Sequence, residues 1–231
     1  MRIYQDCLEM IQETERDLFE MGIKYQSSTV QDLSVENDTG FETLELNGYS
    51  YKLTDIRKAN DMLKYGNINP EWANVEFEER VTSRLLNPGN AWKYQKELWE
   101  KYLRNGEFEY TYNERIRDQI DYVVLELKKF PNTRQAVITI YDQHKDMRNF
   151  GGKARVPCSM YYQFFNRNNK LHCIYTMRSC DFLKHFAGDV YLAIKLGEHI
   201  GHKIGIEFGT MTHFIGSLHA FKVDLIKRGI F

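Results

Sequence analysis

Helical and strand patterns are mixed along this chain, without the regular strand–helix–strand rhythm of a parallel α/β protein. Apolar residues recur at helical spacing in residues 114–129 and 190–204, and the second pattern ends at Gly205. Between them, residues 135–141 are rich in β-branched side chains and predict a buried strand. We therefore expect an α+β protein with a mixed or largely antiparallel sheet and flanking helices.

Further helices are predicted before this region. Residues 1–21 place apolar side chains on one side of a helix that ends at Gly22, and helix 114–129 should stop before Pro131. Residues 70–104 predict a mostly helical stretch that is broken at 87–89.

Two hairpins and one more strand complete the prediction. Residues 43–53 predict a hairpin, because Asn47-Gly48 is the strongest short hairpin signal. Residues 159–166 and 171–177 predict a second hairpin across residues 167–169, and the alternation after residue 204 predicts another strand.

Composition excludes several classes of protein. The chain of 231 residues is 42% apolar and has no repeat or linker, which predicts one domain spanning residues 1–231. A formal net charge of -1 without a basic stripe argues against nucleic-acid binding. No apolar run approaches the roughly 20 residues that span a bilayer, and the first residues do not form a secretory signal. The four cysteines form no C-x-x-C pair, so we expect no metal site and a protein of the reducing cytoplasm.

Cys158 is a candidate nucleophile. A reactive cysteine must ionise, and positive charge from Lys153 and Arg155 nearby in the sequence, and from Arg178 in space, would favour the thiolate. The ordinary alternative is a buried structural cysteine.

Two later segments also contain candidate functional groups. Arg178 and Ser179 follow a predicted strand, where a guanidinium and a hydroxyl suit a phosphate; the alternative is a surface ion pair between Arg178 and Asp181. His219 follows a turn of small residues that could present its ring to a cleft, and the alternative is a hydrogen-bonded core histidine.

Taken in order, four motifs resemble the core of the thymidylate synthase superfamily. These motifs are Pro157-Cys158, Gln163-Phe164, Arg178-Ser179-Cys180-Asp181 and Gly216-x-x-His219. The resemblance is clear over residues 130–221 and looser from residue 76. It implies a thymidylate synthase-like fold, 5,10-methylenetetrahydrofolate as co-substrate, and covalent addition of Cys158 to C6 of a pyrimidine nucleotide.

The resemblance also assigns binding roles by position. Arg178 and Ser179 match the groups that hold the nucleotide 5′-phosphate, and Asp181 matches the aspartate that hydrogen-bonds the folate. Ser217 and His219 lie on the substrate side, where the family's His-x-Tyr holds the sugar. This chain has Phe221 in place of that tyrosine, so half of the sugar contact is absent.

Arg134 is placed like an arginine that the family lends to the partner subunit's phosphate site. The family usually has two adjacent arginines there, whereas this chain has Arg134 followed by Gln135. The resemblance therefore implies a homodimer with a shared active site and small-molecule ligands, namely a nucleotide and a folate.

Upstream, the resemblance places a catalytic glutamate and two aromatic groups. Counting back from Tyr112, which resembles the active-site tyrosine, favours Glu76 as the residue that moves protons at the pyrimidine; Glu78 and Glu79 are alternatives. Trp99 is placed like the tryptophan that packs on the folate. The alternative for the whole segment is an ordinary charged helix.

Asp189 departs from the thymidylate synthases, which have asparagine at this position. An asparagine amide suits uracil, whereas a carboxylate accepts from N4 of cytosine and stabilises a proton on N3. Aspartate here resembles the bacteriophage deoxycytidylate (dCMP) hydroxymethylases, as do residues 37–53 and the sequence Gly216-Ser217-Leu218-His219. Asp189 could instead be a helix N-cap, since it follows Gly188 and begins a helical pattern.

This resemblance implies a phage-encoded dCMP 5-hydroxymethyltransferase that acts in the host cytoplasm. The sequence ends at Phe231, soon after His219, without the long tail that seals thymidylate synthases, which favours attack by water over hydride transfer. The alternatives are a C5-methyltransferase on dCMP or dUMP, a CMP hydroxymethylase of the same fold, and a non-catalytic nucleotide-binding relative.

Overall fold

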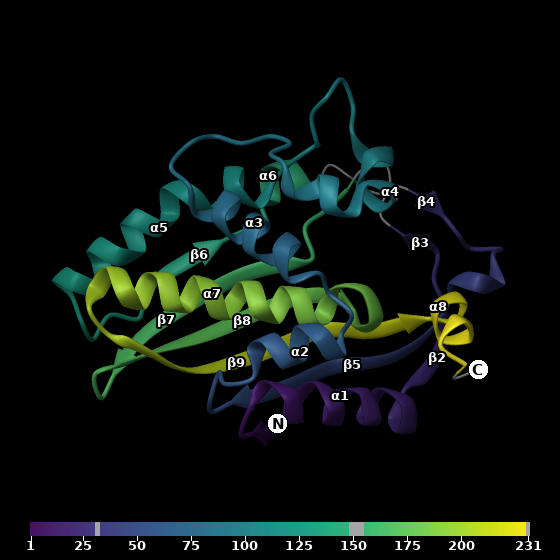
Figure 1. Ribbon diagram of the computed structural model, residues 1–231, viewed down its shortest axis with the longest axis horizontal. Helices are drawn as coiled ribbons and strands as arrows, with labels where there is room; N and C mark the ends of the chain where they lie inside the picture. The colour runs from purple at the N-terminus through teal and green to yellow at the C-terminus, as the bar shows by residue number, and fades with distance from the viewer. Residues whose placement is uncertain (31–32, 148–154, 230–231) are drawn as a thin grey trace.

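The centre of the molecule is a seven-stranded mixed sheet (Figure 1). The computed structural model describes residues 1–231 except 31–32, 148–154 and 230–231. The strand order is β1–β5–β9–β8–β7–β6, with β2 also paired to β5. Strands β8 and β9 are parallel, as are β1 and β5, and the other pairs are antiparallel. The strands are β1 (Arg2–Tyr4), β2 (Ile23–Gln26), β5 (Glu42–Leu53), β6 (Val137–Thr139), β7 (Ser159–Arg167), β8 (Lys170–Asp181) and β9 (Glu207–Phe221), and a separate pair is β3 (Thr29–Val30) with β4 (Leu33–Ser34).

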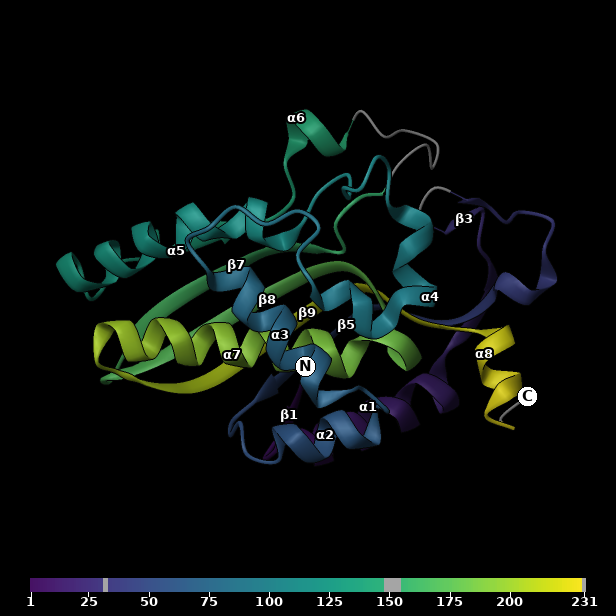
Figure 2. The same ribbon diagram turned by 45° about the horizontal axis from the view of Figure 1, so that its top comes forward.

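Helices α1, α2 and α7 cover one face of this sheet (Figures 1 and 2). Helix α7 packs on β8 and β9, α1 packs on β5, and α5 packs on β6 and β7. The predicted α+β architecture with a mixed sheet and flanking helices is therefore confirmed. The helices are α1 (Cys7–Met21), α2 (Ala59–Tyr65), α3 (Pro70–Val81), α4 (Lys96–Trp99), α5 (Tyr112–Lys129), α6 (Gln143–Asp146), α7 (Ala187–Ile204) and α8 (Lys222–Lys227).

Several local predictions are confirmed by the backbone. Helix α5 begins with the capping box of Thr111 and Glu114 and ends before Pro131. Strands β7 and β8 form a hairpin whose turn residues, Asn168 and Asn169, both have left-handed φ values, 52° and 57°, as a two-residue turn requires. Helix α7 ends at Gly205, whose φ is 73°.

Two predictions are wrong, and a third, the mostly helical stretch over residues 70–104, is confirmed in part. Residues 1–6 do not belong to the first helix, because β1 pairs with β5 and Asp6 caps α1 at the N–H groups of Leu8 and Glu9. The hairpin at 43–53 is instead the single strand β5, in which Gly48 has a φ of +67° without ending the strand. Strand β5 pairs with β9 along its length, and this long ladder overrides the local turn signal. Helix α3 ends at Val81, before the break predicted at 87–89, and residues 91–102 form short helical turns.

The packing around β7 and β8 places the candidate functional groups at one end of the sheet. The backbone N–H of Arg178 donates to the carbonyl of Cys158 at 2.8 Å, which fixes Cys158 beside the last part of β8. Strand β8 continues through a π-helical turn, Phe182–Phe186, into α7. Beneath this end, the rings of Tyr162, Tyr175 and His213 stack at centroid distances of 4.4 and 4.5 Å.

Candidate active site

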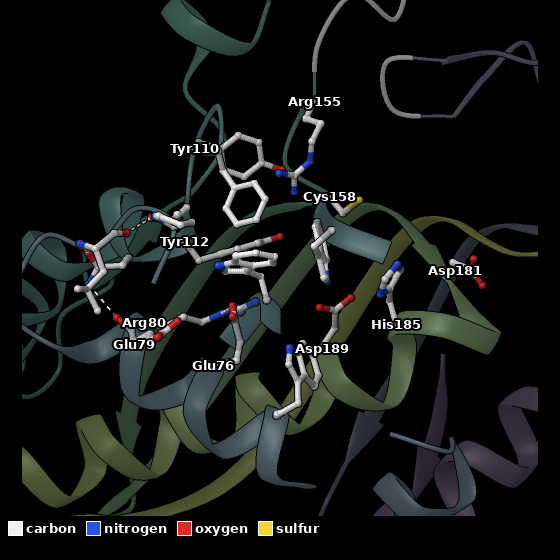
Figure 3. Close-up of a pocket in the computed structure, with 18 of the residues that line it drawn as sticks. Glu76, Glu79, Arg80, Tyr110, Tyr112, Arg155, Cys158, Asp181, His185 and Asp189 are labelled. Atoms are coloured by element: carbon white, nitrogen blue, oxygen red, sulfur yellow. Dashed lines mark hydrogen bonds and ion pairs between the residues drawn. The ribbon is translucent and has the colours of Figure 1, made fainter. Parts of the chain in front are cut away.

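A pocket opens where α3, the segment 86–113, the start of β7, the end of β8 and the start of α7 meet (Figure 3). It brings together seven of the residues to which the sequence assigned a catalytic or binding role, and also Arg155 and the alternative glutamate Glu79. Aromatic rings form much of its wall, and charged side chains lie among them. The lining residues include Trp72, Glu76, Glu79, Arg80, Trp92, Trp99, Phe108, Tyr110, Tyr112, Arg155, Cys158, Ser179, Asp181, His185 and Asp189.

Cys158 is half-buried in the pocket wall and is a free thiol. Its Sγ lies 3.8 Å from the Ser179 hydroxyl and 3.9 Å from an Arg178 nitrogen. Burial raises the pKa of the Cys158 thiol, the Arg178 guanidinium opposes this rise, and the Asp189 carboxyl adds to it. A nucleophilic role for Cys158 would therefore require the site to take a proton from this thiol.

Arg178 lies on the face of β8 turned away from the helices, next to the buried Met177. Its guanidinium donates to the carbonyls of Pro157 and Val156, each at 2.9 Å, and so holds the segment that carries Cys158. Arg178 is not among the residues that line the pocket. It does not pair with Asp181, whose carboxylate caps the π-helical turn at the N–H groups of Leu183 and Lys184, at 3.1 and 3.2 Å.

Glu76 is joined to the pocket by Arg80, one helical turn further along α3. The Arg80 Nε lies 2.7 Å from a Glu76 carboxylate oxygen, and the guanidinium stacks 3.9 Å from the centre of the Tyr112 ring. The Tyr112 hydroxyl is 3.2 Å from Ser159, which in turn bonds Tyr175 at 2.6 Å. Glu76, Arg80 and Tyr112 thus form one connected group in the pocket wall.

The other two candidate glutamates are placed differently. Glu78 is exposed on α3 and does not line the pocket. Glu79 lines it, but its carboxylate accepts from the backbone N–H groups of Asn90 and Ala91, at 2.5 and 3.2 Å. The geometry therefore favours Glu76 for proton transfer and gives Glu79 a role in holding the loop after α3.

We expect Glu76→Gln to lower kcat by about 10²-fold or more, the usual effect of removing a group that transfers protons. Glu78→Gln, on the same helix, should leave kcat unchanged. Glu79→Ala should lower the melting temperature, because two loop N–H groups lose their acceptor. Turnover and thermal unfolding of the three variants would test this assignment, and an unimpaired Glu76→Gln enzyme would contradict it.

Asp189 lies in the first turn of α7, with one carboxylate oxygen 3.8 Å from the Cys180 Sγ. Helix α7 begins at Ala187 and follows directly from the π-helical turn, so the alternative role of Asp189 as an N-cap is wrong. Burial raises the pKa of Asp189. His185 and Arg80 oppose this rise, and the nearby Glu76 carboxylate adds to it. The pocket therefore favours a proton on this carboxyl at a higher pH than usual.

Trp99 and Asp181, the candidates for folate binding, both line the pocket. The Trp99 Nε1 donates to Gln95 at 3.0 Å, and its ring lies 6.3 Å from that of His185. Figure 3 shows Asp181 set apart from the other labelled side chains. Lys153, which was expected to favour the Cys158 thiolate, lies outside the described residues.

Besides Arg178, three predicted site residues lie beyond the pocket lining. Ser217 and His219, 3.2 Å apart, are on β9 directly beside Ser179 and Asp181 of β8. Burial lowers the pKa of the His219 ring, which favours its neutral form. Arg134 is exposed, in the segment between α5 and β6, and is not part of the pocket.

The structure adds residues that the sequence did not identify. Arg80 links Glu76 with Tyr112, and the spacing of four residues from Glu76 on one helix was a usable signal. Tyr110 and His185 also line the pocket, but their sequence neighbourhoods carry no motif. Such side chains are found only when the fold brings separate segments together.

The comparisons with known proteins identify the family. The thymidylate synthase family model matches residues 64–227, so the chain belongs to the thymidylate synthase family. A "putative thymidylate synthase" of Methanocaldococcus jannaschii is 36% identical over 125 residues, covering 52% of this chain and 56% of that protein. A protein of the same name from Methanosarcina barkeri is 32% identical over 161 residues, covering 65% of this chain and 72% of that protein.

Two further findings concern the part of the chain that the structure describes. None of its helices is both long enough and apolar enough to cross a membrane. It also contains no cluster of three or more histidine, cysteine, aspartate or glutamate side chains arranged to hold a metal ion.

Proposed function

We propose that this protein is a folate-dependent transferase that modifies C5 of a pyrimidine nucleotide, and specifically a dCMP 5-hydroxymethyltransferase. The observation that carries the proposal is the presence of Cys158 and Asp189 in the wall of one pocket. Cys158 supplies a nucleophile for C6, and Asp189 supplies a carboxyl group for the cytosine edge. Membership in the thymidylate synthase family supports this class of reaction.

In this proposal the chain's own residues activate the ring. The Cys158 Sγ forms a bond to C6 after losing its proton, and the electron pair of the C5–C6 double bond becomes available at C5. Arg178 favours the thiolate, and Ser179 can donate to the sulfur. Glu76, held by Arg80, and Tyr112 are placed to move the proton that leaves C5.

The pocket also fits a folate co-substrate. Thymidylate synthases use 5,10-methylenetetrahydrofolate, which supplies the one-carbon unit that becomes attached to C5. Trp92, Trp99, Phe108 and Tyr110 offer flat apolar surfaces for fused and benzoyl rings. The buried Nε of Arg155 has no hydrogen-bond partner in the part of the chain that the structure describes, so it can donate to an oxygen of the co-substrate.

Asp189 supports cytosine as the base. One carboxyl oxygen can accept from the N4 amine, while the second shares a proton with N3. With uracil, an ionised Asp189 accepts from N3–H but offers no donor to O4, and mismatched polar groups in a buried site are strongly rejected.

A second candidate is a C5-methyltransferase acting on dCMP or dUMP, which is favoured by the relatives named putative thymidylate synthase. Purified protein would be incubated with methylenetetrahydrofolate and dCMP, dUMP or CMP, and products would be read by mass spectrometry. A gain of CH₂O on dCMP supports the proposal. A gain of CH₂, with dihydrofolate released, supports the second candidate, and reaction on CMP extends the substrate to ribonucleotides.

We also propose that the protein is a homodimer whose partner contributes Arg134 to the phosphate site. The sheet face away from the helices carries Arg178 and an exposed Phe214, and Arg134 is exposed and does not line its own pocket. Mixing inactive Arg134→Ala and Cys158→Ser proteins should restore activity, because each heterodimer that forms contains one intact site. Monomers in sedimentation, or no restoration after subunit exchange, would contradict this arrangement.

A further inference from the structure

Arg80 and Arg155 are buried arginines, and the Arg115 side chain is largely buried, but the three guanidinium groups have different surroundings. Arg80 and Arg155 are 8% and 7% exposed, and the Arg115 side chain is 9% exposed. Arg80 pairs with Glu76 at 2.7 Å and Arg115 pairs with Asp146 at 2.8 Å. Arg155 forms no ion pair with any residue in the described ranges.

A buried guanidinium without a counter-charge is costly, because it loses its hydration and gains no acceptor in exchange. The Nε of Arg155 is buried and has no hydrogen-bond partner among the described residues. The nearby carboxylate of Glu109 accepts from the backbone N–H of Arg155, at 2.9 Å. The protein thus places a cation beside its pocket and leaves its guanidinium donors available.

Four aromatic rings hold this cation in place. The centre of the guanidinium lies 4.8 Å from the Trp99 ring and 5.0 Å from both Tyr102 and Tyr110, with Phe108 at 5.6 Å. Contacts of this kind stabilise a cation electrostatically through the faces of the rings without using its N–H donors. Arg155 lines the pocket, and Figure 3 shows its guanidinium beside Tyr110 on the side of Cys158.

We propose that Arg155 is a binding residue for an oxyanion of a ligand, a carboxylate or a phosphate, which supplies the missing acceptor. This subsite is distinct from Arg178 and Ser179, where the nucleotide phosphate is proposed to bind. It lies against Trp99, on the wall proposed for the folate, so the carboxylates of the co-substrate are the favoured source. In naming these ligands, the inference rests on the proposed function.

The experiment measures binding rather than turnover. Dissociation constants of wild-type protein and Arg155→Met would be compared for two ligand pairs: dCMP with deoxycytidine, and folate with its uncharged diamide. Methionine keeps an unbranched apolar side chain among the rings. If Arg155 makes a charged hydrogen bond to one of these ligands, Arg155→Met should reduce the preference for the anionic member of that pair by about 10-fold or more.

Loss of preference in the folate pair assigns the subsite to a carboxylate, and loss in the nucleotide pair assigns it to the phosphate. Unchanged preferences in both pairs would overturn the proposal. Arg155→Lys, which keeps the charge but loses the planar fork, should show an intermediate loss and serves if the methionine variant does not fold. The matched control is Arg115→Lys. The Arg115 side chain is also largely buried and lies 5.2 Å from the same Tyr110 ring, but it already pairs with the Asp146 carboxylate.

Failure of the proposed function gives a different result. If wild-type protein binds neither dCMP nor folate, the proposed ligands are wrong. The subsite is then tested with benzoate and inorganic phosphate as probes. Binding of either probe that is lost in Arg155→Met supports the oxyanion site, and binding of neither, or binding that does not depend on Arg155, rejects it.

Discussion

Cys158→Ser is expected to lower kcat by about 10³-fold or more while leaving the fold intact. A serine hydroxyl is a far weaker nucleophile than a thiolate, and the neighbouring Arg178 cannot ionise it. Serine is close in size to cysteine, and this side chain is half-buried at the pocket wall, so the loss of stability should be about 1 kcal/mol or less. Nucleotide binding by calorimetry should persist, which separates a lost chemical step from a lost site.

The matched control is Cys7→Ser. Cys7 is fully buried in α1, and its Sγ donates to the carbonyl of Ile56 at 3.4 Å, a bond that a serine hydroxyl can keep. We expect this variant to retain kcat. Iodoacetamide provides a second measurement, because labelling should occur at Cys158 and be lost in Cys158→Ser. Full activity of Cys158→Ser would remove the covalent mechanism and return Cys158 to a structural role.

The fold could be predicted from the sequence where a local signal and the tertiary structure agree. The β7–β8 hairpin and the end of α7 at Gly205 follow directly from residues that adopt left-handed φ values. The strand β5 could not be predicted, because Asn47-Gly48 is a strong turn signal and the partner that overrides it, β9, is more than 150 residues away. Strand β1 was missed for the same reason, since its pairing partner is also β5.

The candidate site shows the same division. The motifs that surround Cys158 and Arg178 were enough to predict that the two residues lie together. In the structure the Cys158 sulfur lies 3.9 Å from an Arg178 nitrogen and 3.8 Å from the Ser179 hydroxyl. No sequence signal indicated that Arg155 has no ion-pair partner among the described residues, because this depends on four rings drawn from two segments and on the direction in which Glu109 points. The choice among Glu76, Glu78 and Glu79 likewise could not be made from the sequence, because it depends on which side of α3 faces the pocket.

Asp189→Asn is expected to reverse the choice of base. The asparagine oxygen accepts from N3–H of uracil and its amine donates to O4, whereas the same amide meets cytosine with a donor facing the N4 amine. We expect the ratio of kcat/KM for dCMP to that for dUMP to fall by about 10²-fold or more. The measurement is competition between the two nucleotides in one reaction, read by product mass. Glu198→Gln is a suitable control, since it removes a carboxylate from the same helix away from the pocket.

The same substitution should change the reactivity of Cys158, which gives a readout independent of the base. The Asp189 carboxylate disfavours a second negative charge on the sulfur and so raises the pKa of the Cys158 thiol. Removing that carboxylate should lower the pKa, so the alkylation rate should reach half its maximum at a lower pH than in the wild type. If this midpoint moves while discrimination stays unchanged, Asp189 acts on the nucleophile and not on the base. If discrimination reverses while the midpoint stays in place, base recognition is its role and the charge is screened from the sulfur.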